Sequence, residues 1–134
     1  YKRCGIPVAN SVCREGVLKM QTLSQARHIS KEDRKLLEEL KQVIHQFLPT
    51  AEIFLYGSVA RGAPTSESDY DVLVLMDQSL DREHEDAVRD AVYDLELVRG
   101  ILISLVFCTQ DHWDRPLVRV SPFRQEVERD AIRL

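Results

Sequence analysis

The sequence predicts a single α+β domain, an α/β two-layer arrangement in which a small mixed β-sheet carries helices packed on one face. Its length of 134 residues suits one domain with one hydrophobic core. Apolar residues make up 44% of the chain and charged residues 30%, which is typical of a globular protein and excludes a disordered or fibrous one. Helical and strand-like apolar periods alternate in the order helix, strand, strand, helix, strand, helix.

The first predicted helix begins after Ser30, because Ser30 to Asp33 resembles a capping box with Asp in place of Glu. Pro49 ends this helix, since proline cannot continue one. Ala51–Tyr56 is short, mostly apolar and followed by Gly57, which indicates a largely buried strand. The apolar positions of the helix recur every 3.6 residues and are Leu36, Leu37, Leu40, Val43, Ile44, Phe47 and Leu48.

The second predicted strand is Tyr70–Met76, an apolar and β-branched run without glycine or proline. The loop Gly57–Asp69 joins it to the first strand and consists mainly of small and polar residues. Loops held by strands often carry function. We therefore expect the chemistry of this chain to lie in that loop.

A second helix is predicted to follow, capped by Ser79 or Asp77 and ended by Gly100. Ile101–Phe107 is the third predicted strand. A serine followed by a proline then predicts the start of a last short helix, Phe123–Ala131. The apolar face of the second helix consists of Leu80, Ala87, Val88, Ala91, Val92 and Leu95.

Residues 1–29 are expected to form an N-terminal extension of unassigned role, and residues 30–134 the domain, because sustained periodicity begins at Ser30. The net charge of −4 is uneven, with eight Lys or Arg against three Asp or Glu in residues 1–35. Only this amino-terminal part could attract nucleic acid. It has no helix-turn-helix pattern and no interleaved aromatic residues, so a solvated basic tail is the alternative that we favour.

Tyr1–Lys19 contains no continuous apolar stretch and no apolar run approaches the ~18 residues of a membrane span, so we expect neither a secretory leader nor a membrane anchor. The expected compartment is the cytoplasm. The three cysteines form no CxxC pair and are interpreted as reduced thiols, and the histidines are too scattered to gather a transition metal. These residues are Cys4, Cys13, Cys108, His28, His45, His84 and His112.

Two aspartates open the second strand, ten residues after a Gly-Ser pair that ends the first. Residues two apart on a strand project to the same face, so Asp69 and Asp71 lie together, about 7 Å apart along the backbone. Two such carboxylates repel each other unless a cation lies between them. Mg2+ prefers one or two carboxylates together with water and substrate phosphates. The pair therefore predicts a metal-bound polyphosphate, and hence a nucleotide.

The loop supplies further groups that suit a polyphosphate. Gly57 permits close approach of the backbone, and Ser58 offers a hydroxyl and a backbone N–H group. Val59–Gly62 can form a first helical turn whose free N–H groups attract anions, and Arg61 adds a permanent positive charge. Each half of the pattern alone would indicate only a solvated turn. The spacing of the two halves between flanking strands favours a functional site.

Residues 56–75, YGSVARGAPTSESDYDVLVL, resemble the signature of the nucleotidyltransferase superfamily that includes DNA polymerase beta, and most closely its minimal members. The resemblance implies an Mg2+-dependent transfer of a nucleoside monophosphate from an NTP to an acceptor, with release of pyrophosphate. The NTP expected first is ATP, and the transferred group is then AMP. It implies that Asp69 and Asp71 are the catalytic metal ligands, that Gly57 and Ser58 hold the triphosphate, and that Arg61 supports either role. Two Mg2+ ions would clamp the reacting oxygens.

One departure from the family pattern concerns activity. Members of the superfamily commonly carry a third carboxylate on the next strand, where this chain has Ser104, a poor Mg2+ ligand that carries no charge at neutral pH. Glu52 and Glu96 are the acids nearest to the predicted strands, although solvated positions at strand edges explain both. The alternative is therefore a catalytically weak nucleotide-binding and regulatory module.

Minimal members resemble the antitoxin partners of all-helical HEPN ribonucleases, so the resemblance implies a HEPN-type protein as one possible partner under either interpretation. We expect a chain of this length to leave one wall of the site open, which a second copy of the chain could also close. The apolar carboxyl-terminal stretch is a candidate contact surface, although packing on the chain's own sheet is the alternative that we favour. It comprises Trp113, Pro116, Leu117, Val118, Val120 and Phe123.

Overall fold

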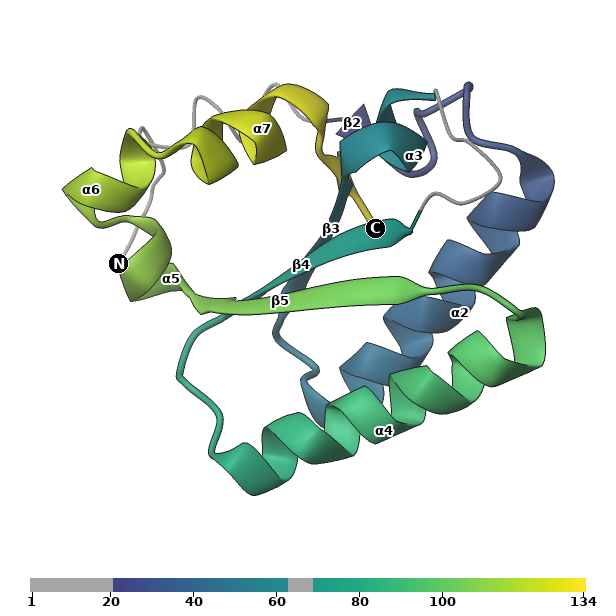
Figure 1. Ribbon diagram of the computed structural model, residues 1–134, viewed down its shortest axis with the longest axis horizontal. Helices are drawn as coiled ribbons and strands as arrows, with labels where there is room; N and C mark the ends of the chain where they lie inside the picture. The colour runs from purple at the N-terminus through teal and green to yellow at the C-terminus, as the bar shows by residue number, and fades with distance from the viewer. Residues whose placement is uncertain (1–20, 63–68) are drawn as a thin grey trace.

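The computed structural model describes residues 21–62 and 69–134 as a five-stranded sheet with helices against both of its faces (Figure 1). The predicted α+β class is confirmed, although the sheet has five strands in place of three and the helices occupy two faces in place of one. In chain order the elements are β2 (Gln21–Thr22), α2 (Lys31–Phe47), β3 (Glu52–Tyr56), α3 (Gly57–Arg61), β4 (Tyr70–Met76), α4 (Arg82–Arg99), β5 (Ile103–Thr109), α5 (Gln110–Trp113), α6 (Pro116–Arg119), α7 (Pro122–Asp130) and β6 (Ile132–Arg133).

The sheet is mixed, with the spatial order β2-β6-β3-β4-β5. β3 runs antiparallel to both β4 and β6, whereas β5 is parallel to β4 and β2 is parallel to β6. The α4 helix makes the crossover that a parallel β4–β5 pair requires. In the resulting register Tyr56 lies opposite Asp71, and Asp71 lies opposite Ser104.

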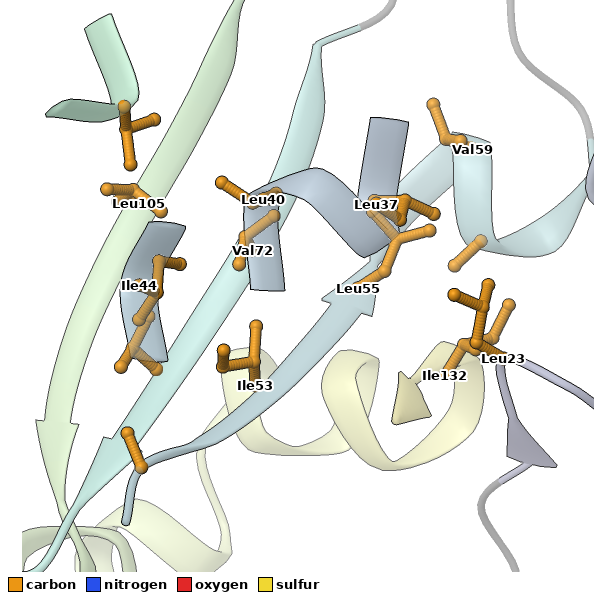
Figure 2. Close-up of a cluster of buried hydrophobic side chains, with 14 of the residues drawn as sticks. Leu23, Leu37, Leu40, Ile44, Ile53, Leu55, Val59, Val72, Leu105 and Ile132 are labelled. Carbon is orange, nitrogen blue, oxygen red and sulfur yellow. The ribbon is translucent and has the colours of Figure 1, made fainter. Parts of the chain in front are cut away.

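The face under α2 and α4 is aliphatic. Ser30 caps α2 by accepting a hydrogen bond from the Asp33 backbone N–H group, as predicted. Figure 2 shows the α2 side chains over the β3 and β4 side chains, with Leu23 and Ile132 at one end. Residues before Ser30 also enter this core, since Leu23, Ala26 and Ile29 are buried. The largest fully buried members of the cluster are Leu37, Leu40, Ile44, Leu55, Val72, Val74, Val88, Val92 and Ile132.

The opposite face is covered by α5, α6 and α7, and its core contains rings and polar groups. The ring of Phe123 on α7 meets the Tyr56 ring edge-on, with 5.5 Å between the ring centroids. Arg124 is buried, stacks over the Trp113 ring at 4.3 Å and donates a hydrogen bond to the Trp113 carbonyl at 2.5 Å. Trp113 and Phe123 thus pack on the chain's own sheet, while Leu117 remains 84% exposed.

Several element boundaries differ from the sequence prediction for local reasons. Asp81, and neither Ser79 nor Asp77, caps α4, because its carboxylate accepts from the His84 backbone N–H group. β5 begins at Ile103, two residues later than predicted, since the Ile101 N–H group still bonds to the last turn of α4. Short helices α5 and α6 were not predicted, and a run of four residues is too short to show a helical period.

No helix within residues 21–62 and 69–134 combines the length and hydropathy needed to cross a membrane. Cys108 is a buried free thiol, as expected for a reduced cysteine. Cys4, Cys13 and most of the basic amino-terminal segment lie outside the described residues. Across the described ranges no three His, Cys, Asp or Glu side chains converge as a metal-binding group.

Candidate functional site

The Gly-Ser turn and the paired aspartates meet at the end of β3. Gly57 adopts φ +82°, and a Cβ atom placed on it would lie 2.4 Å from Oδ2 of Asp71. The left-handed backbone favours glycine here, and any side chain at this position would have to displace the Asp71 carboxylate. The two halves of the sequence pattern, fourteen residues apart in numbering, form one site because the Asp71 carboxylate lies directly against the turn.

Three adjacent strands present a row of polar side chains beside this turn. Strand alternation directs Tyr56 and Asp71 to the face that α7 covers, and Ser104, the register partner of Asp71 on β5, lies on the same face. Asp69, two residues before Asp71, precedes β4 and is exposed. Ser104 is exposed at the start of β5, the edge strand. Exposure to solvent therefore increases along the row, from the buried Tyr56 ring to the half-buried Asp71 carboxylate and the exposed Ser104.

Burial and nearby charge disfavour ionisation of the Tyr56 and Asp71 side chains. The pKa of the Asp71 carboxyl is raised above its usual value, first by burial and then by the charges of Asp69 and Glu126. The nearby Arg61 guanidinium opposes that shift. Burial likewise raises the pKa of Tyr56 to about 12, with contributions from Asp71 and Glu126. The site thus concentrates negative charge in a partly desolvated place, which a divalent cation would relieve.

Arg61 is tied to the far end of α7. Its Nη1 donates to Oδ2 of Asp130 at 2.7 Å, and the Asp130 side chain is only 3% exposed. Arg129 binds the other oxygen of that carboxylate at 2.9 Å. On the other side of α3, Nε2 of His28 lies 2.6 Å from the Ala60 carbonyl. The short helix that starts at Gly57 is therefore held by side chains from two separate segments.

The strand that carries the aspartates is held from its other face. Tyr70, between Asp69 and Asp71, points toward α2 and donates its hydroxyl proton to Oδ1 of Asp33 at 2.6 Å. Burial and this hydrogen bond raise the pKa of Tyr70 to about 12. The Tyr70 backbone N–H group also donates to the Leu102 carbonyl at 3.0 Å. Both bonds fix the start of β4, and therefore the positions of the two carboxylates.

Glu52 and Glu96, the acids nearest to the predicted strands, each contact a different part of the sheet. Glu52 lies at the opposite end of β3 from Tyr56, with its carboxylate 3.7 Å from the Arg133 guanidinium. Glu96 accepts a hydrogen bond from the Ile103 backbone N–H group at 2.7 Å and so caps the start of β5. Besides Asp69, the acid whose charge raises the pKa of Asp71 is Glu126 on α7. No local pattern marks it, since only the packing of α7 on β3 and α3 brings it there.

The donor set suits a magnesium ion that is shared with phosphates. Asp69 and Asp71 supply two carboxylates, and Mg2+ typically takes one or two from a protein and completes its shell with water and substrate phosphate oxygens. No third acid of the described segments converges closely enough to form a closed cage. Burial, and after it the charges of Asp69 and Glu126, raise the pKa of Asp71, and a bound cation would favour the ionised carboxylate.

The chain is similar to one protein family and to individual known proteins. A family model described as a nucleotidyltransferase domain matches residues 34–131. A protein of Methanocaldococcus jannaschii, provisionally named a protein adenylyltransferase, is 30% identical over 113 residues, which cover 84% of this chain and 98% of that protein. A crystal structure of the Cid1 poly(U) polymerase with MgGTP bound is 26% identical, with a TM-score of 0.38 over 64% of this chain, and this chain spans 25% of that polymerase chain.

Proposed function

The chain belongs to the nucleotidyltransferase domain family, and from this premise we propose that it transfers AMP from ATP to a hydroxyl group of a protein, with Mg2+ as cofactor. The observation that carries the proposal is the contact between the Gly57 turn and the Asp71 carboxylate, which joins a phosphate-binding element to a metal-binding one. The likeness to a relative named a protein adenylyltransferase supports AMP as the transferred group and a protein as the acceptor.

Each site residue has a defined task in this proposal. Asp69 and Asp71 would hold the metal, which would supply positive charge for the triphosphate and for the leaving pyrophosphate. Gly57 leaves room for the phosphates against the backbone, and Ser58 contributes its hydroxyl and N–H groups. Arg61, fixed by Asp130, keeps α3 in place and adds positive charge beside Asp71.

The proposed reaction needs no covalent intermediate on the protein. The acceptor oxygen attacks the α-phosphorus, a new O–P bond forms, and the bond from that phosphorus to the bridging oxygen of pyrophosphate breaks. The residues of the chain contribute by orienting the reactants and by stabilising charge, which can account for much of the barrier reduction in phosphoryl transfer.

Ser104 favours a second candidate, a nucleotide-binding regulatory module with weak catalysis. It lies opposite Asp71 in the register, at the place where the superfamily commonly has its third carboxylate, and a serine hydroxyl does not accept a proton at neutral pH. In this candidate the chain binds Mg·ATP and acts by holding a partner, a HEPN-type protein or a second copy of the chain.

The test separates the two candidates. Incubation with a total protein extract, Mg2+ and ATP labelled at the α-phosphorus should label acceptor proteins, whereas ATP labelled at the γ-phosphorus should label none. ATP at 100 times its dissociation constant should stabilise the folded protein by roughly 2.7 kcal/mol, which raises its melting temperature. The double variant Asp69→Asn, Asp71→Asn should lose both the transfer and the part of this stabilisation that depends on Mg2+. A full Mg2+-dependent shift of the melting temperature in the double variant would show that these carboxylates do not bind the metal. A shift without transfer in the unmodified protein would favour the binding module.

A further inference from the structure

The position of α7 supplies an acid where β5 has none. Along one face of this helix lie Phe123, Glu126 and Asp130, at spacings of three and four residues. Phe123 packs on the Tyr56 ring, and Asp130 binds Arg61 at the end of α3. The two outer residues therefore fix where the middle one lies.

Those two contacts place Glu126 beside the reactive end of the site. Tyr56 is the register partner of Asp71, and α3 starts at Gly57, against which the Asp71 carboxylate lies. A residue between Phe123 and Asp130 on that helix face projects toward this junction. Glu126 is half-buried, and its charge influences both Asp71 and Tyr56.

We propose that Glu126 is the third carboxylate of the site and accepts the proton of the acceptor hydroxyl, the task for which Ser104 is chemically unsuited. This inference rests on the proposed adenylyl transfer. Glu126 forms no ion pair with any of the described residues, so its carboxylate is available for such a task. It does not join Asp69 and Asp71 in a metal-binding group of three, and for that reason we assign it the proton and not the metal.

The proton transfer completes the balance of the reaction. The acceptor O–H bond breaks as the oxygen bonds to the α-phosphorus, and the proton passes to the Glu126 carboxylate. Pyrophosphate leaves with the electron pair of the broken P–O bond. Glu126 approaches from the α7 side of Asp71, whereas a carboxylate at position 104 would approach from β5. The same proton could thus be taken from either side of the Asp71 carboxylate.

The test uses two simple alcohols as acceptors, ethanol and the more acidic trifluoroethanol, and measures alkyl-AMP and pyrophosphate formed from Mg·ATP. Glu126→Gln should lower the rate with ethanol by about 10²–10⁴-fold, the usual contribution of a general base. It should lower the rate with trifluoroethanol clearly less, because a more acidic alcohol depends less on a base. The thermal shift caused by Mg·ATP should stay unchanged.

Two further variants make the test specific. Glu128→Gln makes the same chemical change on the same helix, but its carboxylate faces Arg124 at 3.3 Å, and its ratio of the two alcohol rates should equal that of the unmodified protein. Ser104→Asp in the Glu126→Gln background should restore transfer to ethanol, because it places a carboxylate on the other side of Asp71.

The outcomes distinguish this inference from the proposed function. Equal rates for Glu126→Gln and the unmodified protein would overturn the role of Glu126 while leaving adenylyl transfer intact. Equal losses with both alcohols, without rescue by Ser104→Asp, would also overturn it, because such losses indicate a purely structural effect. An unmodified protein that transfers AMP to neither alcohol nor to any protein would overturn both.

Discussion

The two faces of the sheet differ in the helices that cover them and in the side chains that they bury. α2 and α4 contain 17 and 18 residues, and their buried side chains are aliphatic. α5, α6 and α7 contain 4, 4 and 9 residues, and they enclose aromatic rings, the Cys108 thiol and the Arg124 guanidinium. The site residues Tyr56, Asp71 and Ser104 all lie on this second face.

The difference teaches how so small a domain separates stability from chemistry. Long helices bury a continuous apolar surface, which provides most of the free energy of folding. Short helices leave room for charged groups, and each of those groups must be placed by a particular contact such as Asp130 with Arg61. Substitutions in the aliphatic core of the first face should therefore change mainly stability, whereas substitutions on the second face should also change ligand binding and transfer.

The largest expected effect is on the aliphatic face. Leu40 has no exposed surface, and Leu40→Ala should lower the free energy of unfolding by about 2–5 kcal/mol through lost burial and the cavity left behind. The Mg·ATP dissociation constant, measured below the melting transition, should not change. A weakened affinity in the folded variant would contradict the division between the two faces.

The next effect concerns Gly57, for which the chain supplies its own control. Gly57→Ala should cost about 1–3 kcal/mol for a left-handed backbone that carries a side chain, and it should also displace the Asp71 carboxylate, 2.4 Å from the new Cβ. Gly100 has φ +67° and nothing within 4 Å of such a Cβ. Gly100→Ala should therefore cost a similar backbone energy and leave Mg·ATP binding unchanged. Calorimetry measures the stability of both variants, and titration measures their Mg·ATP dissociation constants. Equal effects of the two substitutions on binding would show that Gly57 has no role in the phosphate site.

A smaller effect is expected at Tyr70, on the α2 side of the strand that carries both aspartates. Tyr70→Phe removes the hydrogen bond to Asp33 and should cost about 0.5–1.5 kcal/mol. The folded-state pKa of about 12 exceeds the ordinary value of 10.0, so the unfolded chain loses this proton first. The stabilisation is thus fully present below pH 10 and is lost as the pH rises through about 12. Denaturant unfolding between pH 8 and 12 should show a smaller alkaline loss in the variant, and an unchanged slope would contradict the assignment.

The smallest effect should come from the contact between α3 and α7. Arg61 is 43% exposed, so Arg61→Ala should cost about 0.2–1 kcal/mol of stability. Hydrogen bonds from Arg129 and Arg61 hold the pKa of the Asp130 carboxyl below its usual range despite burial. Its stabilisation is present above the ordinary value of 3.8 and is lost as the pH falls through the lowered pKa. A double-mutant cycle with Asp130→Ala measures the pair, and strictly additive losses would show that Arg61 acts apart from α7.

The sequence could predict the elements whose signals are local. Ser30 and the apolar stripe that follows it predict α2, and the mostly apolar segment Tyr70–Met76, without glycine or proline, predicts β4, both as observed. β2 and β6 have two residues each, too few to show any period, and they exist only because distant segments pair with them. The fold class could be predicted, and so could α7 from Ser121 and the proline after it, whereas the four-residue helices α5 and α6 could not.

The same distinction applies to the candidate site. Gly57, Ser58, Asp69 and Asp71 share one short segment, so their spacing could be read directly, although their roles stay predictions. Glu126 is more than fifty residues from Asp71 in the sequence, and its charge acts on that carboxylate only because α7 docks on β3 and α3. An acid that joins a site by tertiary packing has no signature along the chain.

The position of Asp71 between Tyr70 and Val72 also affects which strand pairing the chain can adopt. A slip of β4 by one residue would turn every one of its side chains to the other face. Asp71 would then enter the aliphatic cluster beneath α2 and α4, where an unpaired carboxylate is strongly disfavoured, and Val72 would face the polar side. The carboxylate that we assign to the metal thus also excludes misaligned sheets, so its replacement by an apolar residue should broaden the range of folded states as well as remove a ligand.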